Sequence, residues 1–161
     1  MLFRSAGIHD KFVDAVTERL KKLVVGNGLD PKTEMGPVVS ASQLDQDQAY
    51  VKIARDEGAT LKLGGELLNR PTQGYYMAPA LFTDTTNKMR INREEVFGPV
   101  ASVVKVKDFE SALETANDTE FGLSAGIVTS SLKYSSAFKR RAQAGMVMVN
   151  LPTRSEERRV G

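Results

Sequence analysis

The hydrophobic positions along the chain follow two periods, and the first is that of an amphipathic helix. Within residues 8–24 the apolar positions are three or four residues apart, with charged residues between them: Phe12, Val13, Val16, Leu20 and Leu23. This spacing places them on one helical face. Similar patterns predict helices over residues 40–57, 108–117 and 131–143. Ser40 or Ser42 is expected to cap the second helix, and Asp108 the third.

Short apolar segments separate these helices and predict strands over residues 59–63, 100–106, 123–129 and 146–150. Val103–Val104 and Met146–Val149 are apolar on both faces, which is typical of a parallel sheet covered by helices on both sides. Residues 75–82 are also extended, but we expect Pro79 to prevent a regular central strand. The alternation of strands with helices predicts an α/β fold, with a largely parallel sheet flanked by helices.

The composition fits one soluble domain and excludes several kinds of site. With 161 residues, 41% of them hydrophobic, the chain is long enough to form a single core. It has no cysteine, which excludes disulfides, thiolate metal sites and a cysteine nucleophile within this chain. Because His9 is its single histidine, a multi-histidine metal site is excluded too, and we assign no metal ligands. A formal charge of +2 is too small to indicate binding to nucleic acid or to a membrane surface.

The start of the chain contains no recognisable targeting signal. The segment before the first predicted helix is too short for a signal peptide, and no run of about 18 apolar residues is present to span a bilayer. We therefore expect a cytoplasmic protein.

The two ends do not fit the pattern of the middle. Leu2–Ser5 and Arg154–Gly161 show no apolar periodicity. One piece of double-stranded DNA can encode Leu-Phe-Arg-Ser in one direction and Arg-Ser-Glu-Glu in the other, and it resembles a common sequencing adapter. We expect residues 1–5 and 154–161 to be adapter-derived, non-native ends, the alternative being a natural basic tail. Without them the chain is formally neutral, because they hold four of its 22 basic and two of its 20 acidic residues.

The segment Glu94–Val100 holds the most informative chemistry. Two carboxylates precede an aromatic residue, a Gly-Pro turn and a predicted strand. Alternate side chains of an extended loop point the same way, so Glu95 and Phe97 are expected to share one surface. A carboxylate accepts hydrogen bonds from ribose hydroxyls, and an aromatic ring packs on a flat heterocycle. The alternative is a capping acid beside a core phenylalanine.

This segment, Glu-Glu-Val-Phe-Gly-Pro-Val, resembles a signature of the NAD(P)-dependent aldehyde dehydrogenase superfamily. Further family motifs follow in the same order along residues 6–153, at residues 28–31, 35–37, 56–59, 64–65, 74–76, 116–117, 121–125 and 144–150. The resemblance implies that residues 6–153 are part of an aldehyde dehydrogenase catalytic domain. Residues 42–47 and 145–153 are most similar to the branch that oxidises α-ketoglutaric semialdehyde (2,5-dioxopentanoate).

The resemblance implies an activity for the whole enzyme and indicates which parts of that enzyme are absent from this chain. Family members oxidise a small-molecule aldehyde to a carboxylate with NAD or NADP, through a cysteine thiolate and a glutamate-activated water. They also carry an oligomerisation arm, which implies a homo-oligomer with no nucleic-acid or membrane partner. The chain resembles the part after the catalytic cysteine, and the cofactor domain is absent. We therefore assign no catalytic residues and expect this stretch alone to be inactive.

The resemblance also assigns cofactor-binding residues. Glu95 matches the acid that holds the nicotinamide ribose, and Phe97 matches the aromatic residue that flanks it. Gln43 and Gln46 match polar positions that contact the cofactor, although some members carry a lysine at the position of Gln46. For both glutamines the alternative is a solvated helix face.

Two other functions remain open at this point. The chain can be read as a noncatalytic binding or interaction domain derived from this fold, or as a regulatory module that retains nucleotide binding through Glu95 and Phe97. His9 is expected at the surface or in a capping role. Lys139–Arg141 is expected on a solvated helix face and not in a nucleic-acid site.

Overall fold

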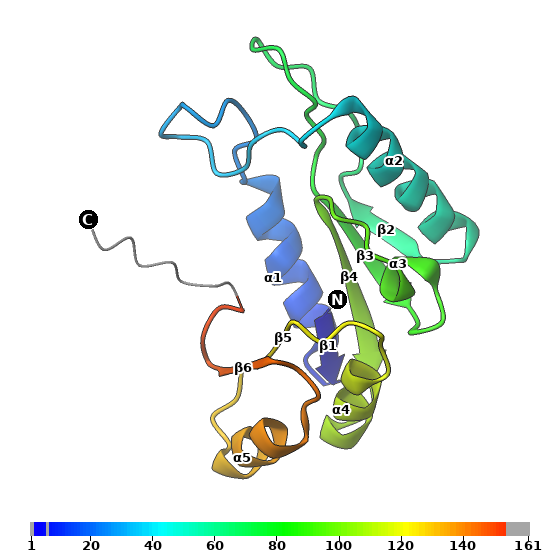
Figure 1. Cartoon of the computed structure of the whole chain (residues 1–161), viewed down its shortest axis with the longest axis vertical. Helices are drawn as coiled ribbons and strands as arrows, with labels where there is room; N and C mark the ends of the chain where they lie inside the picture. Colours follow the sequence, from blue (N-terminus) through cyan, green and yellow to red (C-terminus); the bar gives the residue numbers. More distant parts are fainter. Residues whose placement is uncertain (1, 6, 154–161) are drawn as a thin grey trace. The chain divides into compact units, whose positions relative to one another are not determined.

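Residues 2–5 and 7–153 are described in the computed structural model, and they belong to two compact units. The first unit extends to Lys107, and the second starts at Asp108. Figure 1 shows the helices and strands of each unit in chain order. The predicted α/β class is confirmed, because helices accompany two small sheets whose strand pairs are mostly parallel.

The first unit contains a four-stranded sheet with the strand order β1-β4-β3-β2. Its strands are β1 (Leu2–Ser5), β2 (Thr60–Leu63), β3 (Ala80–Thr85) and β4 (Val100–Val106). Strand β4 pairs in parallel with β1 and β3, whereas β2 is antiparallel to β3. The edge strand β2 therefore departs from the parallel pairing of its neighbours.

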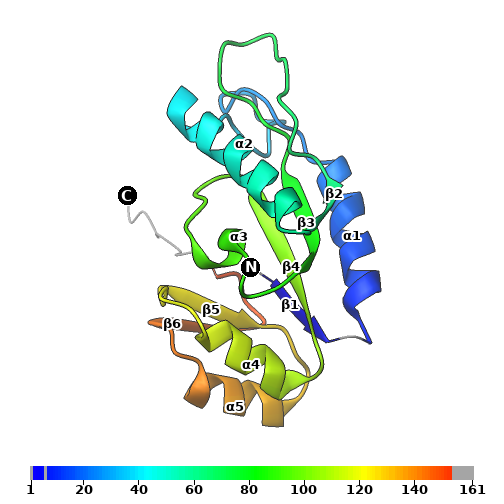
Figure 2. The ribbon, with the colours of Figure 1, turned by 90° about the vertical axis from the view of Figure 1, so that its right-hand side faces the viewer.

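Two helices cover opposite faces of this sheet (Figure 2). Helix α1 (His9–Lys21) packs its apolar face on Leu81 and Val103. Helix α2 (Ala41–Asp56) packs its apolar face on Phe82. Leu81 and Phe82 are adjacent and fully buried, so alternate side chains of β3 belong to two separate cores.

Two helices have the N-terminal caps that the sequence predicts. The Ser40 hydroxyl accepts a 3.1 Å hydrogen bond from the backbone N–H of Gln43, so Ser40 is the capping serine of α2. The Asp108 carboxylate caps α4 (Phe109–Asn117) by accepting a 2.9 Å bond from the backbone N–H of Ser111. These short-range contacts set the start of each helix.

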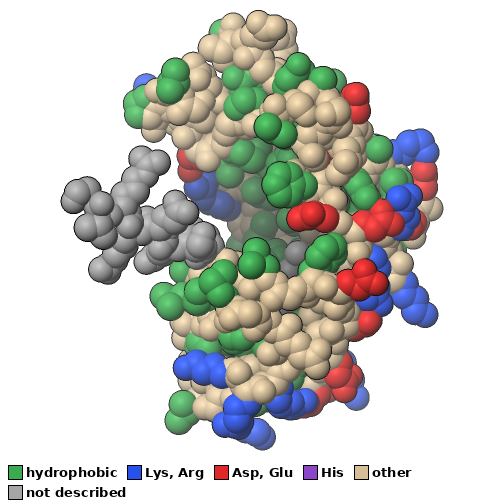
Figure 3. Space-filling view, in the orientation of Figure 1, with side chains coloured by type: hydrophobic (Ala, Val, Ile, Leu, Met, Phe, Trp, Pro, Cys, Tyr) green, Lys and Arg blue, Asp and Glu red, His purple; other side chains and the backbone are tan. Residues whose placement is uncertain are grey.

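The second unit is a βαβ arrangement with a further helix. Strands β5 (Ser124–Ile127) and β6 (Met146–Val149) pair in parallel, and the unit also contains α4 (Phe109–Asn117) and α5 (Leu132–Arg141). Asn117 connects the two helices, because its Nδ2 donates to the carbonyl of Arg141 at 2.9 Å. Several apolar side chains of this unit reach the surface (Figure 3), among them Leu123, Val128 and Leu132, each about four-fifths exposed.

Three features differ from the sequence predictions. Strand β1 and the short helix α3 (Arg90–Arg93) have no counterpart among the predicted elements. Pro79 does lie outside any strand, but Ala80–Thr85 follow it directly as a strand paired on both edges. Proline is tolerated there because the first paired N–H is that of Ala80, which donates to Pro99 O at 2.8 Å.

The predicted non-native ends fall partly within the described residues. Leu2–Ser5 pair with β4 through their backbone, and such pairing does not depend on side-chain identity. Residues 154–161 lie outside the described residues. The origin of both ends therefore stays a prediction.

Candidate functional site

The predicted site lies on the loop that joins α3 to β4. The helix ends at Glu94, whose backbone is extended, and the strand begins at Val100. The loop is anchored at its end by two backbone hydrogen bonds, from Ala80 N–H to Pro99 O at 2.8 Å and from Val100 N–H to Gly98 O at 2.7 Å. These bonds fix the last residues of the loop, Gly98 and Pro99, to the first residues of β3 and β4.

Phe97 has an unusual conformation for a large apolar residue. Its side chain is 74% exposed, and its backbone φ is +56°. A positive φ is uncommon for a residue with a Cβ atom, and such strain is often kept at binding sites. The prediction of a core phenylalanine is therefore wrong. Glu95, two residues earlier on the same loop, is also exposed.

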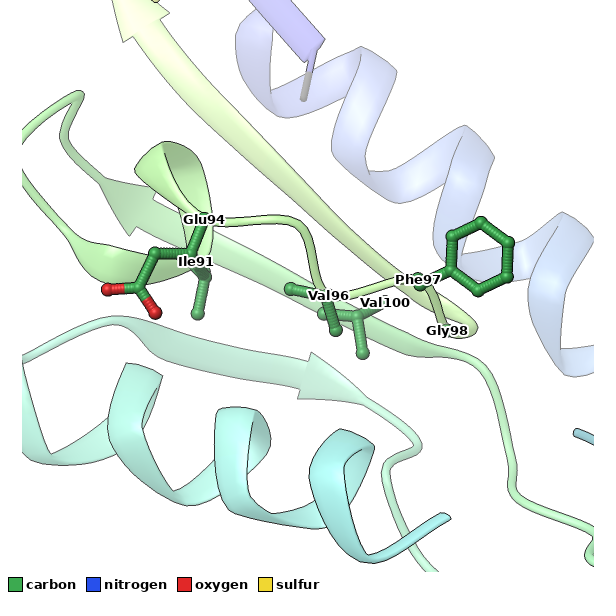
Figure 4. Close-up of a pocket in the computed structure, with 6 residues that line it drawn as sticks. All are labelled: Ile91, Glu94, Val96, Phe97, Gly98 and Val100. Atoms are coloured by element: carbon green, nitrogen blue, oxygen red, sulfur yellow. The ribbon is translucent and has the colours of Figure 1, made fainter. Parts of the chain in front are cut away.

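An open hollow of about 400 Å³ lies beside this loop. It is lined by Ile91, Glu94, Val96, Phe97, Gly98 and Val100. Figure 4 shows the Phe97 ring at one end of this group, turned away from Ile91 and Glu94. The lining of the hollow combines apolar side chains with the Glu94 carboxylate and the loop backbone, and the exposed Phe97 ring stands at its edge.

Gln43 and Gln46 bind the loop from the first two turns of α2. The Nε2 atoms of both donate to the carbonyl oxygen of Val96, at 3.0 Å from Gln43 and 3.1 Å from Gln46. The alternative of a solvated helix face is therefore wrong for Gln43, which is half-buried, whereas Gln46 is exposed as that alternative expects and also donates to the loop. The structure brings the two glutamines together with the Glu95–Phe97 loop, about 50 residues further along the chain.

Asp47 is a site residue that the sequence analysis missed. It is fully buried, and its Oδ1 accepts a 2.7 Å hydrogen bond from Gln43 Nε2. Burial raises the pKa of this carboxyl, and the bond from Gln43 opposes that shift. One signal was available: Gln43, Asp47 and Val51 are each four residues apart, so Asp47 lies on the inward face of the predicted helix.

Gly98 has a packing role beside Asp47. A Cβ atom on this glycine would lie 2.0 Å from Asp47 Oδ1 and 2.2 Å from its Cγ, so only glycine fits against the carboxyl group. The Gly-Pro pair therefore does more than turn the chain, because it also leaves room for a buried side chain of α2.

Glu94 is a structural residue, unlike its neighbour. Its carboxylate accepts hydrogen bonds from Arg90 Nε at 2.7 Å and from the Tyr50 hydroxyl at 2.6 Å. These bonds lower its pKa to about 2, the Arg90 bond having the larger effect. Glu94 therefore holds α3 against α2, whereas the neighbouring Glu95 is exposed.

The expected surface position is wrong for one of the two weaker candidates, His9, and confirmed for the other, the basic segment on α5. His9 is buried, so the expected surface position is wrong; its Nδ1 lies 2.8 Å from Asp10 Oδ1. Lys139 and Arg140 lie on an exposed helix face as predicted, and the neighbouring Arg141 pairs with Glu110 at 2.6 Å. In the part of the chain that is described, no helix has the length and hydrophobicity of a membrane span.

A model of the aldehyde dehydrogenase family matches residues 1–161. The chain belongs to the aldehyde dehydrogenase family. The resemblance that the motifs indicate is thereby confirmed, and it includes the Glu-Glu-Val-Phe-Gly-Pro segment that forms the loop described above.

Curated aldehyde dehydrogenases give the same result over most of the chain. A betaine aldehyde dehydrogenase of Mesorhizobium japonicum is 43% identical over 151 residues, which are 92% of this chain and 31% of the relative. An alpha-ketoglutaric semialdehyde dehydrogenase of Bacillus subtilis is 40% identical over 147 residues, which are 90% of this chain and 30% of the relative. The chain therefore spans about a third of the length of these relatives.

Solved aldehyde dehydrogenase structures share the fold. The HpcC protein from Thermus thermophilus superposes with a TM-score of 0.91 at 36% identity, over 96% of this chain and 31% of that one. The betaine aldehyde dehydrogenase of Staphylococcus aureus in complex with NAD+ gives a TM-score of 0.91 at 33% identity, with the same coverage. The two units described here are thus a portion of the aldehyde dehydrogenase fold.

Proposed function

We propose that this chain is part of an enzyme that oxidises an aldehyde to a carboxylate with NAD or NADP, and that its Glu95–Phe97 loop binds the nicotinamide ribose. The observation that carries the proposal is the exposed Phe97 ring at positive φ, two residues from an exposed carboxylate. The exposed ring and the exposed carboxylate both face solvent in this chain. Both suit a bound nucleotide, which would cover the ring and donate hydroxyls to the acid.

The two loop residues have complementary roles in this proposal. The Glu95 carboxylate accepts hydrogen bonds from the ribose hydroxyls, since an ionised carboxylate acts as an acceptor with two oxygens. The Phe97 ring packs against the ribose and the edge of the nicotinamide, which removes apolar surface from water on both sides. The ring is 74% exposed and turned away from Ile91 and Glu94 (Figure 4), so its face is accessible for this contact.

In this proposal Gln43 and Gln46 contact the cofactor through the amide groups that their bonds to the loop and to Asp47 do not occupy. Both N–H groups of the Gln43 amide are engaged, by Asp47 and by Val96, so its carbonyl oxygen is the group that would accept from the cofactor. Gln46 donates a single bond to Val96 and keeps one N–H for a cofactor hydroxyl or phosphate. Their part in cofactor binding therefore combines loop support with one polar contact each.

The aldehyde chemistry itself needs groups that this chain lacks. A thiolate nucleophile requires cysteine, and none of the 161 residues is one. When bound, the nicotinamide supplies the hydride acceptor. We accordingly propose that the chain by itself is inactive and that it supplies part of the nicotinamide site to the whole enzyme.

Two aldehydes are suggested by relatives of similar identity. We propose α-ketoglutaric semialdehyde as the substrate, supported by the Bacillus subtilis enzyme of that name and by the resemblance of residues 42–47 and 145–153. Betaine aldehyde is the second candidate, supported by the Mesorhizobium japonicum enzyme. We also propose that the whole enzyme is a homo-oligomer, as the family resemblance implies, and that it is cytoplasmic, as expected in the sequence analysis.

A titration tests the proposed nucleotide contact. Nicotinamide mononucleotide, added at millimolar concentration to the ¹⁵N-labelled chain, should shift the backbone resonances of residues 95–98. Glu95→Gln and Phe97→Ala should abolish these shifts, whereas the exposed controls Glu66→Gln and Phe121→Ala should leave them unchanged. A folded wild-type chain whose loop resonances do not respond would contradict the proposal.

A second measurement addresses the alternative of a noncatalytic domain. The purified chain, mixed with NAD+ and either aldehyde, should produce no NADH. A nucleotide response without turnover agrees with a portion of an enzyme. Absence of the nucleotide response, together with tight binding of another protein, would favour an interaction domain instead.

A further inference from the structure

Asp47 stands out among the buried side chains of the described residues. It is the one carboxylate among those less than a tenth exposed, and its own exposure is 0%. No cation pairs with it in the described part of the chain, and its Oδ2 has no hydrogen-bond partner there. Burying a carboxyl without a cation partner lowers the stability of the folded state. Its presence here indicates that its shape or its hydrogen bond has a role.

The contacts of Asp47 all lead to one loop. Gln43 Nε2 bridges Asp47 Oδ1 at 2.7 Å and the Val96 carbonyl at 3.0 Å, so the carboxylate orients the amide that holds Val96. On the other side, the Asp47 carboxyl lies directly against Gly98. Val96 and Gly98 are the two neighbours of Phe97, the residue at positive φ.

We propose that Asp47 is a positioning residue of the nicotinamide-binding loop, which acts by fixing Val96 through Gln43 and Gly98 by direct packing. A backbone at positive φ relaxes unless its neighbours are held in place. Asp47 secures both neighbours from a single site on α2. Its significance for the cofactor rests on the proposed function, because Asp47 would act through Phe97 and Glu95 without touching the nucleotide.

The substitutions separate shape from hydrogen bonding. Asp47→Asn keeps the side-chain shape and an acceptor oxygen for Gln43, whereas Asp47→Leu keeps the branching and the number of non-hydrogen atoms, is bulkier, and removes the acceptor. Gln43→Met removes both donated bonds from a half-buried position that is safer for folding. Asp45→Asn and Asp45→Leu are matched controls, since Asp45 is exposed on the same helix.

The primary readout needs no cofactor. In the 161-residue chain, Asp47→Leu and Gln43→Met should move the backbone ¹³C and ¹⁵N resonances of Val96, Phe97 and Gly98, and elsewhere in the first unit only those of residues around the substituted position. In Asp47→Asn and in both Asp45 variants these loop resonances should stay at their wild-type positions. Unchanged Phe97 resonances in Gln43→Met, together with a folded Asp47→Leu of wild-type spectrum, would overturn the proposal.

A second readout connects the loop to the nucleotide. Binding of nicotinamide mononucleotide should weaken about tenfold in Asp47→Leu, because Glu95 and Phe97 are then displaced from the positions that suit the nucleotide. In Asp47→Asn the affinity should stay within about twofold of wild type. If the loop resonances move as expected while wild type binds no nucleotide, the proposed function fails and the positioning role stands. If wild type binds and Asp47→Leu changes neither loop nor affinity, the positioning role fails alone.

Discussion

The Tyr50 hydroxyl donates a 2.6 Å hydrogen bond to Glu94 Oε2, which joins the middle of α2 to the residue that ends α3. Arg90 completes the contact with bonds of 2.7 and 2.8 Å to the same carboxylate. Glu94 is thereby held next to Glu95, the residue that we propose binds ribose. The first acid of the pair is engaged in the fold, and the second is left exposed.

This contact predicts a dependence on acid pH. The pKa of Glu94 is lowered from 4.5 to about 2, so its ionised form stabilises the folded state fully above pH 4.5. That stabilisation is lost as the pH falls from 4.5 through about 2. Carboxyl ¹³C NMR should show a Glu94 midpoint near pH 2.

Tyr50→Phe should raise the midpoint of Glu94 toward its ordinary value, because one of the bonds to the ionised form is removed. Tyr75→Phe is the control, since the partly exposed Tyr75 lies outside this contact. An equal shift in both variants would contradict the assignment to the Tyr50 hydroxyl.

Two phenylalanines should differ sharply in their effect on stability. Phe82 is fully buried between β3 and α2, and Phe82→Ala should lower the free energy of unfolding of the first unit by about 3–5 kcal/mol. Phe97 is 74% exposed, and Phe97→Ala should change it by less than about 0.5 kcal/mol. Urea unfolding monitored by circular dichroism measures both. A large loss in Phe97→Ala would show that the ring supports the fold.

Three glycines form a graded series for backbone strain. At Gly64 the φ is +73° and a Cβ would lie 2.0 Å from Pro79 O, so Gly64→Ala should destabilise by well over about 1 kcal/mol. Gly58 has φ +95° in open space, and its alanine variant should lose about 1 kcal/mol from φ alone. Gly36→Ala should be near neutral. Thermal unfolding of the three variants should give this order.

The ends of the chain make a prediction at the level of DNA. We propose that residues 1–5 and 154–161 derive from one adapter, so the codons for Leu2–Ser5 should be the reverse complement of those for Arg154–Glu157. Sequencing the source DNA on both sides of residues 6–153 measures this directly. Unrelated codons at the two ends would contradict the proposal.

The local elements were predictable because their causes act over a few residues. The helical period placed Val13 on the inner face of α1 and Val51 on that of α2, where both are buried. Ser40 and Asp108 cap their helices through bonds that span three residues. Periodicity and capping are properties of short stretches, and no distant contact is needed to recognise them.

Other elements depended on long-range contacts. Helix α3 has four residues and no clear period, and it is held by Tyr50 and Glu57 from α2 and its C-terminus. The sequence predicts an extended segment over residues 75–82 but no regular central strand, because Pro79 lies inside it, whereas in the structure Pro79 precedes the first paired residue. Neither outcome can be deduced from a window of neighbouring residues.

For the site, the sequence predicts Glu95, Phe97, Gln43 and Gln46 as candidates, because family motifs and side-chain chemistry can be recognised without a structure, and their role in cofactor binding stays a proposal. The tertiary structure decided how these residues are arranged: both glutamines donate to the Val96 carbonyl, and the Asp47 carboxyl packs against Gly98. It also decided that Phe97 is exposed and Glu94 engaged. The physical reason is that burial and hydrogen bonding join residues about 50 positions apart, and such contacts exist only once helix α2 has packed on the sheet.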